Sequence, residues 1–357
     1  MIESRCSQVL AQLKGISMLC RRFAIGRAVA LVMVAAHPLV APAQQVPSFT
    51  RQEDVIYGRK YGTALTMDVF TPKKDANGAA AILVVSGGWS SAREFPAKFV
   101  FVDELLTRGY TVFAVVHSSQ PQYPIPEIIQ DVNRAVRFIR YHARDYKIDP
   151  SRLGIYGASS GGHLALMQGT AGDTGDPSAK DPVEKVSSRV QAVACFFPPT
   201  DFLNYGKPGE VALGRGALAG LKAAFDFREF DARTKAFVPV KGEERILKIG
   251  REISPVYHVS PDDPPTLIFH GDADKLVPLQ QSELLVQKLK EKGVEAKLVV
   301  KPGIGHAYGL VMGLGDGWPD VTKDLALIAD WFDRHLREQD AGDDGRLPHA
   351  RVERSGG

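Results

Sequence analysis

The sequence predicts an α/β fold built on one doubly wound, mostly parallel sheet. Two observations lead to this prediction. Segments with strand-like and helix-like patterns alternate along most of the 357 residues, as they do when crossover helices join parallel strands. In addition, residues 79–85 form a continuous apolar run, Ala-Ala-Ala-Ile-Leu-Val-Val, which is typical of a strand buried on both faces.

The individual elements follow from their periodicity. Residues 55–57 and 65–70 alternate apolar and polar side chains and are bounded by glycine and proline, which predicts strands. Residues 125–146 place apolar side chains on one face of a helix, namely Ile128, Val132, Val136 and Ile139. Further strands are predicted at 111–116, 153–156, 190–197, 266–269 and 296–300. Further helices are predicted at 99–108, from Leu164 onward, at 279–292 and at 321–336.

These elements make one domain, which we expect to span residues 55–336. Residues 44–54 are predicted to form a linker before it. Residues 205–250 interrupt the alternation with mixed, partly helical sequence, and we interpret them as a small cap insertion over the strand ends. Residues 337–357 are polar and glycine-rich, so we expect a disordered tail.

The N-terminal 43 residues have the pattern of a signal peptide. Arg21, Arg22 and Arg27 precede an apolar run at residues 28–40, and Ala41-Pro42-Ala43 supplies a small-x-small cleavage site. The run has 13 residues, whereas a membrane-spanning helix needs about 20, which disfavours the alternative of a membrane anchor. Met18 lies just before the arginines, so residues 1–17 are interpreted as a possible upstream extension. We expect a periplasmic or secreted protein without stable membrane insertion after signal removal.

Charge and composition exclude several classes of function. The net charge is +3, and the first 43 residues hold five basic residues and one acidic residue, so the rest carries −1. Lysine and arginine are scattered, and no nucleic-acid partner is expected. No cluster of cysteine and histidine has the spacing of metal ligands. A zinc site is therefore not expected, and the site residues described below imply neither a metal nor a cofactor.

The segment Gly157-Ala158-Ser159-Ser160-Gly161 matches Gly-x-Ser-x-Gly, the nucleophile elbow between a strand and a helix. Centring the pattern on Ser160 would put alanine where the first glycine belongs, so Ser159 is the candidate nucleophile. The main-chain N–H of the following residue, Ser160, is then a candidate oxyanion donor. A glycine-rich turn without catalysis is the alternative, while the spacing of a phosphate-binding loop is absent.

A serine hydroxyl needs a base and an acid that orients the base. In folds that carry a nucleophile elbow between a strand and a helix, the acid follows the serine along the chain and the base follows the acid. His306 lies in a glycine-flanked loop after the strand predicted at 296–300, and it is the candidate base. Asp272 and Asp274 both follow the strand predicted at 266–269, and position alone does not separate them.

A glycine-rich loop after an early strand completes the candidate site. Gly87 and Gly88 follow the buried run at 79–85 and precede Trp89. Glycines allow main-chain N–H groups to face a substrate oxygen without a Cβ in the way. Gly87, Gly88 and Ser160 are therefore the predicted oxyanion hole.

Together these motifs resemble an exported α/β-hydrolase of the esterase/lipase superfamily. The chain is most similar to the branch of feruloyl-esterase-like and arylformamidase-like enzymes and prolyl-oligopeptidase-type catalytic domains. The resemblance covers residues 55–336 and is carried by "KIDPSRLGIYGASSGGHLA", "HGDADKLVP" and "GIGHAYG". It implies that Asp274 is the triad acid and that Asp272 holds its loop. The branch commonly has His-Gly-Gly-x-Trp at the oxyanion loop, and here Val85 and Ser86 replace the first two residues.

The expected function is hydrolysis of a carboxylic ester by a serine hydrolase through an acyl-enzyme, with a small-molecule or carbohydrate-linked ester as substrate. A peptidase or amidase with the same triad is the alternative, because fold and triad do not fix the substrate. A non-catalytic binding protein is less expected, since such a protein usually lacks a triad member and all three are present here.

Overall fold

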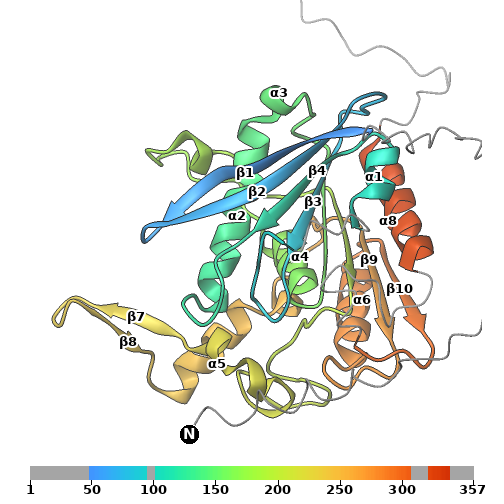
Figure 1. Cartoon of the computed structure of the whole chain (residues 1–357). Helices are drawn as coiled ribbons and strands as arrows, with labels where there is room; N and C mark the ends of the chain where they lie inside the picture. Colours follow the sequence, from blue (N-terminus) through green and yellow to red (C-terminus); the bar gives the residue numbers. More distant parts are fainter. Residues whose placement is uncertain (1–47, 95–100, 307–320, 338–357) are drawn as a thin grey trace, which may run out of the picture. The chain divides into compact units, whose positions relative to one another are not determined.

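The computed structural model describes residues 48–94, 101–306 and 321–337. The predicted signal peptide and nearly all of the predicted tail lie outside these ranges. Within them the chain forms one large sheet flanked by helices (Figure 1). The sheet strands are β1 Phe49–Lys60, β2 Thr63–Pro72, β3 Ala80–Val85, β4 Thr111–Val116, β5 Leu153–Ala158, β6 Ala192–Phe196, β9 Thr266–Gly271 and β10 Ala296–Lys301. The helices are α1 Asp103–Thr107, α2 Ile125–Tyr141, α3 Ala143–Tyr146, α4 Ser160–Ala171, α5 Glu243–Glu252, α6 Gln280–Glu291 and α8 Val321–Leu336.

The strand order in the sheet is β1-β2-β4-β3-β5-β6-β9-β10. The first three strands of this order pair antiparallel, and every later neighbour pairs parallel. The predicted doubly wound, mostly parallel sheet is therefore confirmed. Since the carboxyl ends of parallel strands meet at one edge, the loops after β3, β5, β9 and β10 gather there.

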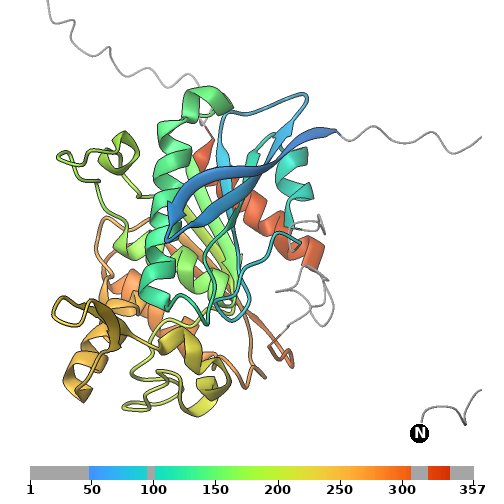
Figure 2. The same ribbon diagram turned by 60° about the vertical axis from the view of Figure 1, so that its left-hand side comes forward.

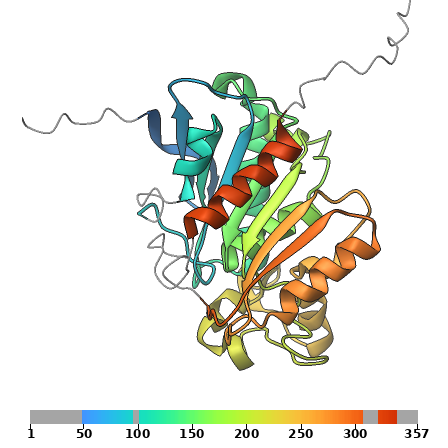
Figure 3. The ribbon, with the colours of Figure 1, turned by 90° about the vertical axis from the view of Figure 1, so that its right-hand side faces the viewer.

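Alternating side chains of the buried strands fill two separate cores. On β3, Ile82 and Val84 belong to the core under α2, α4 and α6, whereas Leu83 and Val85 belong to the core under α1 and α8. Figure 2 shows α2 along one face of the sheet, and Figure 3 shows α8 lying across the other. The fully buried run at residues 79–85 is explained by this two-sided cover.

Several predicted boundaries differ from the structure; for example, the helix predicted over residues 125–146 is divided at His142 into α2 and α3. Two of the differences have clear local reasons. Part of the predicted linker, residues 49–54, belongs to β1. The side chains there are mostly polar because β1 is an edge strand, and they carry no apolar alternation although the main chain pairs with β2. The helix predicted from Leu164 begins at Ser160. Gly161 and Gly162 have low helix propensity, which hid the first turn in the sequence.

The predicted insertion at 205–250 holds small elements of its own. They are a 3-10 helix η3 (Gly216–Phe225), the hairpin strands β7 (Arg228–Asp231) and β8 (Ala236–Pro239), and most of α5. The strand pair β7-β8 is separate from the large sheet. Leu221 in η3 lies so close to Gly88 that a Cβ on that glycine would come within 2.9 Å of it. The insertion thus contacts the predicted oxyanion loop.

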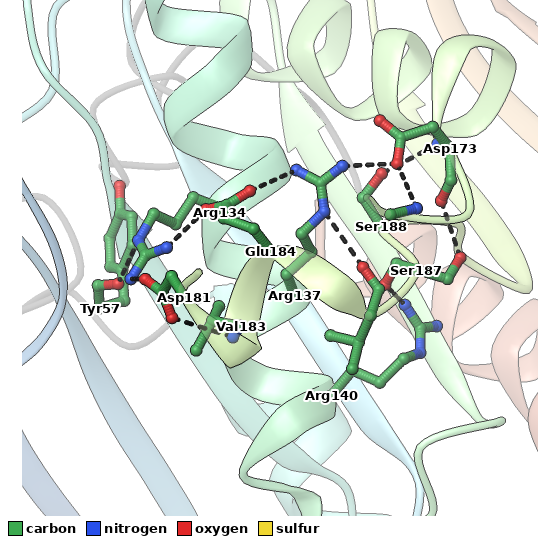
Figure 4. A network of polar contacts seen from close by, with 12 residues as sticks. Tyr57, Arg134, Arg137, Arg140, Asp173, Asp181, Val183, Glu184, Ser187 and Ser188 are labelled. Atoms are coloured by element: carbon green, nitrogen blue, oxygen red, sulfur yellow. Dashed lines mark hydrogen bonds and ion pairs between the residues drawn. The ribbon is translucent and has the colours of Figure 1, made fainter. Parts of the chain in front are cut away.

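A cluster of arginines fixes the long excursion between α4 and β6. Arg134, Arg137 and Arg140 are spaced three apart on α2 and so share one face of the helix. All three reach residues 173–189 (Figure 4). Their partners there are the carboxylates of Asp173, Asp181 and Glu184 and the carbonyls of Val186, Ser187 and Arg189.

Candidate active site

Ser159 lies at the tight turn between β5 and α4. Its backbone has φ 54° and ψ −120°, a region that non-glycine residues rarely adopt. The turn depends on the glycines on both sides. A Cβ on Gly157 would come within 2.7 Å of the main chain of Gly161, and a Cβ on Gly161 within 2.6 Å of the Val84 carbonyl oxygen. The strain and these close approaches are the local features of a nucleophile elbow.

The structure brings Ser159, His306 and Asp274 together, although they are far apart in the sequence. The Nε2 atom of His306 lies 3.1 Å from Ser159 Oγ. The Nδ1 atom of His306 lies 2.7 Å from Asp274 Oδ2. Since an ionised carboxylate only accepts, Nδ1–H donates to Asp274 and Nε2 is left to accept from the serine hydroxyl. The three side chains form one hydrogen-bonded line.

Asp274 is almost completely buried, yet its surroundings favour the charged form. Its Oδ1 accepts the main-chain N–H groups of Leu276 and Val277, both at 2.9 Å. Burial by itself raises the pKa of this carboxyl, but the side chains of His270 and His306 and the Val277 N–H outweigh burial and lower the pKa far below its ordinary value. Asp274 is therefore ionised at neutral pH.

Asp272 has a different partner. Its Oδ1 accepts the main-chain N–H of Gly303 at 2.6 Å, three residues before His306. The Ile304 carbonyl accepts the N–H of Ala273 at 3.0 Å, and it approaches so closely that a Cβ on Gly271 would come within 2.1 Å of it. Asp272 thus ties its own loop to the loop that carries His306.

The oxyanion loop differs from the sequence prediction at one position. The N–H of Gly87 donates to the Ser90 carbonyl at 2.8 Å, and the N–H of Ser90 donates back to Gly87 at 3.0 Å. This small bridge already uses the Gly87 donor, so the prediction of Gly87 as an oxyanion donor is not supported by this conformation. Gly88, with φ +57°, and Ser160, the first residue of α4, are the remaining predicted donors.

The side chain of Ser160 has a partner that the sequence did not indicate. Its Oγ lies 2.9 Å from Ser86 Oγ, and both side chains are buried. Ser86 begins the oxyanion loop and Ser160 begins the helix after the elbow. Where the resembling branch commonly has glycine in the loop, the serine here connects the two halves of the site.

Trp89 and His163 make a second connection. The indole Nε1–H of Trp89 donates to His163 Nδ1 at 3.1 Å, so His163 carries its proton on Nε2 and donates it to the Ile253 carbonyl at 2.7 Å. All three residues are buried. Burial lowers the pKa of His163 to about 4, although the bond to Ile253 opposes this shift. A neutral histidine therefore links the oxyanion loop, α4 and the residue that follows α5.

Sequence reasoning missed two polar groups of the site. His270 donates from Nε2 to the Val277 carbonyl at 2.8 Å, contacts Ser282 through Nδ1 at 2.6 Å, and lies 3.5 Å from Asp274. It is the first residue of the His-Gly-x-x-Asp segment, which was the available signal. For Ser86, the only indication in the sequence was that serine stands where the oxyanion loop of the branch commonly has glycine.

Comparison with known families places the chain. The model of the family described as BD-FAE matches residues 67–289, more than half of the sequence. The chain belongs to the BD-FAE family. The predicted resemblance to α/β-hydrolase esterases is thereby confirmed.

Curated relatives of this BD-FAE chain are named for ester hydrolysis. The probable carboxylic ester hydrolase LipM of Mycobacterium tuberculosis (strain ATCC 25618 / H37Rv) is 27% identical over 275 residues, which cover 74% of this chain and 57% of LipM. The esterase LipQ of the same organism is 25% identical, with 72% of this chain and 57% of LipQ covered. The chain spans little more than half the length of these relatives.

Solved structures agree on the fold. A truncated carbohydrate esterase from gut microbiota is similar with a TM-score of 0.61 and 28% identity, over 80% of this chain and 96% of that one. Esterase 2 of Thermogutta terrifontis gives a TM-score of 0.61 at 22% identity, over 83% and 95% of the two chains. The second likeness shows the α/β-hydrolase fold alone.

Among the described residues, no group of three or more His, Cys, Asp or Glu side chains is arranged to hold a metal ion. The same part of the chain contains no helix with the length and apolar character needed to span a bilayer.

Proposed function

We propose that this protein is a serine hydrolase that cleaves carboxylic esters, with Ser159 as nucleophile, His306 as general base and acid, and Asp274 as the acid that orients His306. The observation that supports this proposal most is the hydrogen-bonded line of these three side chains at the carboxyl edge of the sheet. The names of the curated relatives favour esters among the possible acyl substrates.

In the proposed first step, Ser159 Oγ attacks the ester carbonyl carbon while His306 Nε2 takes the hydroxyl proton. The ionised Asp274 stabilises the imidazolium that forms. The main-chain N–H groups of Ser160 and Gly88 donate to the oxyanion of the tetrahedral intermediate, each typically contributing about 3 kcal/mol. Ser160 is the first residue of α4, where unpaired N–H groups and the helix dipole favour negative charge.

The intermediate collapses when His306 returns its proton to the leaving alcohol. An acyl-enzyme on Ser159 remains. Water, deprotonated by His306, then attacks the acyl carbon, and the serine hydroxyl is regenerated with release of the carboxylic acid. The proposed substrate is a small-molecule or carbohydrate-linked ester.

A panel of p-nitrophenyl and feruloyl esters beside aminoacyl anilides tests this function. We expect hydrolysis of esters and loss of this hydrolysis in Ser159→Ala. Labelling with a fluorophosphonate followed by peptide mapping should place the label on Ser159. Faster cleavage of the anilides than of every ester would replace esterase by amidase or peptidase, and a label on another serine would contradict the assigned nucleophile.

A further inference from the structure

A cleft with an aromatic lining lies where the β1-β2 turn, the segment before α2 and the β7-β8 hairpin meet. Its volume is about 400 Å³, within the usual range of about 300–1,000 Å³ for ligand pockets. Its lining includes Tyr61, Tyr123, Glu127, Asp226, Arg228 and Phe237. Figure 1 shows the β1-β2 turn and the β7-β8 hairpin projecting on the same side of the molecule.

We propose that this cleft binds a sugar ring of a carbohydrate-linked substrate, with Tyr61 and Phe237 as the stacking surface. Tyr61 is 70% exposed and Phe237 is 49% exposed. Their rings lie edge to face, with centroids 6.1 Å apart. Large aromatic side chains that stay this exposed and adjacent are unusual away from binding surfaces.

The backbone at Tyr61 supports a functional reason for this aromatic residue. Tyr61 and Gly62 form the two-residue turn between β1 and β2, with φ values of 46° and 83°. A turn with both φ values positive strongly favours Asn-Gly, and a bulky side chain is disfavoured there. The chain thus keeps a strained tyrosine at a place where asparagine would fit better and where the ring buries little surface.

The inner wall of the cleft is fixed in place. Tyr123 is buried and its ring lies nearly parallel to that of Tyr61, at an interplanar angle of 11°. Lys60 Nζ lies 4.6 Å from the centroid of the Tyr123 ring, and Thr63 Oγ1 lies 3.1 Å from the Tyr123 hydroxyl. A rigid wall of this kind lowers the entropic cost of binding.

Charged groups on the rim decide the chemical class of the occupant. Glu127 and Asp226 offer carboxylate oxygens, and Arg228, which donates to Asp226 at 2.9 Å and 2.7 Å, offers further N–H groups. A sugar has an apolar C–H face that can stack on an aromatic ring and hydroxyl groups that both donate and accept. A lipid chain would instead bury these charged groups without forming hydrogen bonds to them, and such burial costs free energy.

Two residues that neighbour the cleft lining in the sequence contact the oxyanion loop. Gln120 donates from Nε2 to the Gly88 carbonyl at 2.6 Å, and the next residue, Pro121, lines the cleft. On the other side, Phe225 packs edge to face on Trp89 with a centroid distance of 5.4 Å, and the next residue, Asp226, also lines the cleft. A sugar bound here would therefore lie beside the oxyanion loop. That this sugar is part of the substrate rests on the proposed ester hydrolysis. The binding of a sugar in the cleft does not depend on that proposed function.

Calorimetric titration with unesterified xylohexaose and cellohexaose tests the proposal on the full protein. Neither probe contains an ester, so failure of the proposed hydrolysis would not affect the measurement. We expect at least one hexasaccharide to bind. Phe237→Ala and Tyr61→Asn should each weaken binding about tenfold, the scale of losing one aromatic anchor. Asparagine suits the turn, so Tyr61→Asn is expected to fold normally even if Phe237→Ala disturbs the hairpin.

Two further variants complete the test. Phe237→Trp keeps an aromatic ring at this position and, unlike Phe237→Ala, should keep the wild-type affinity. Tyr141→Ala removes an exposed ring at the far end of α2, about 24 Å along the helix from Ile125, and should leave binding unchanged. Absence of binding by both hexasaccharides, or equal affinity in Tyr61→Asn and wild type, would overturn the proposal. Tighter binding of free ferulate, lost in the same variants, would assign the cleft to an aromatic acid instead.

Discussion

Asp272 and Asp274 are two residues apart, yet they have separate partners. Asp274 accepts from His306 Nδ1, and Asp272 accepts from the Gly303 main chain. Position in the sequence left the two equivalent, and only the resemblance favoured Asp274.

Substitution separates the proposed acid from the loop tie. We expect Asp274→Asn to lower turnover by about 10⁴-fold, because the amide favours the wrong histidine tautomer. Asp272→Ala should lose about 1 kcal/mol of unfolding free energy, the usual net value of one hydrogen bond, and keep most of its activity. Steady-state kinetics and urea unfolding measure both. An inactive but stable Asp272→Ala beside an active Asp274→Asn would reverse the assignment.

The buried pair Ser86 and Ser160 provides a second prediction. Each single alanine variant should reduce kcat about tenfold, the rate equivalent of losing a hydrogen bond of about 1.4 kcal/mol that positions the oxyanion loop. Because both variants remove the same bond, the double variant should be no slower than the slower single variant. Effects that multiply in the double variant would show that the two hydroxyls act independently.

At the scale of the elements, the sequence predicted those with a strong apolar pattern. Both bounds of β4 agree with the prediction, and α8 ends at Leu336 as predicted. The beginnings of β1 and α4 were missed, since edge-strand pairing and glycine-rich first turns are set by tertiary contacts and not by local pattern. In the candidate site, Ser159, Asp274 and His306 could be predicted because each lies in a short motif after a strand. The use of the Gly87 N–H by Ser90 depends on the fold of the loop, which no motif encodes.

The link between the oxyanion loop, α4 and the end of α5 makes the stability of the fold depend on pH. The pKa of His163 falls from its ordinary value of 6.5 to about 4 because of burial. Between these values the unfolded chain binds a proton that the folded protein does not. The contribution of His163 is therefore complete above pH 6.5 and declines as the pH falls towards 4, by roughly 3 kcal/mol in all.

Chemical denaturation at several pH values between 7 and 4.5 checks this expectation. The decline of the unfolding free energy on acidification should be shallower in His163→Gln than in wild type. Gln168→Ala serves as the matched control, since Gln168 is buried on α4 like His163 and its side chain does not titrate, and it should keep the wild-type slope. An unchanged slope in His163→Gln would show that other groups cause the acid sensitivity.

For the whole molecule, we propose export with removal of the first 43 residues. The described fold begins at Ser48, so cleavage after Ala43 leaves every described strand and helix in place. Protein expressed in a bacterial host should be recovered from the periplasm or medium with an N-terminus at or near Gln44, as N-terminal sequencing would show. Recovery of the uncleaved chain from the membrane fraction would instead indicate an anchor.

The contact between the β9 loop and the β10 loop also limits how this fold recombines with its relatives. The Ile304 carbonyl occupies the space that any side chain at position 271 would need, and the Asp272 carboxylate accepts from Gly303. A chimaera with a crossover inside residues 275–302 would take these two loops from different parents. Crossovers placed outside residues 271–306 take Asp274, His306 and the contacts between their loops from the same parent. Chimaera libraries built in that way should retain more active members.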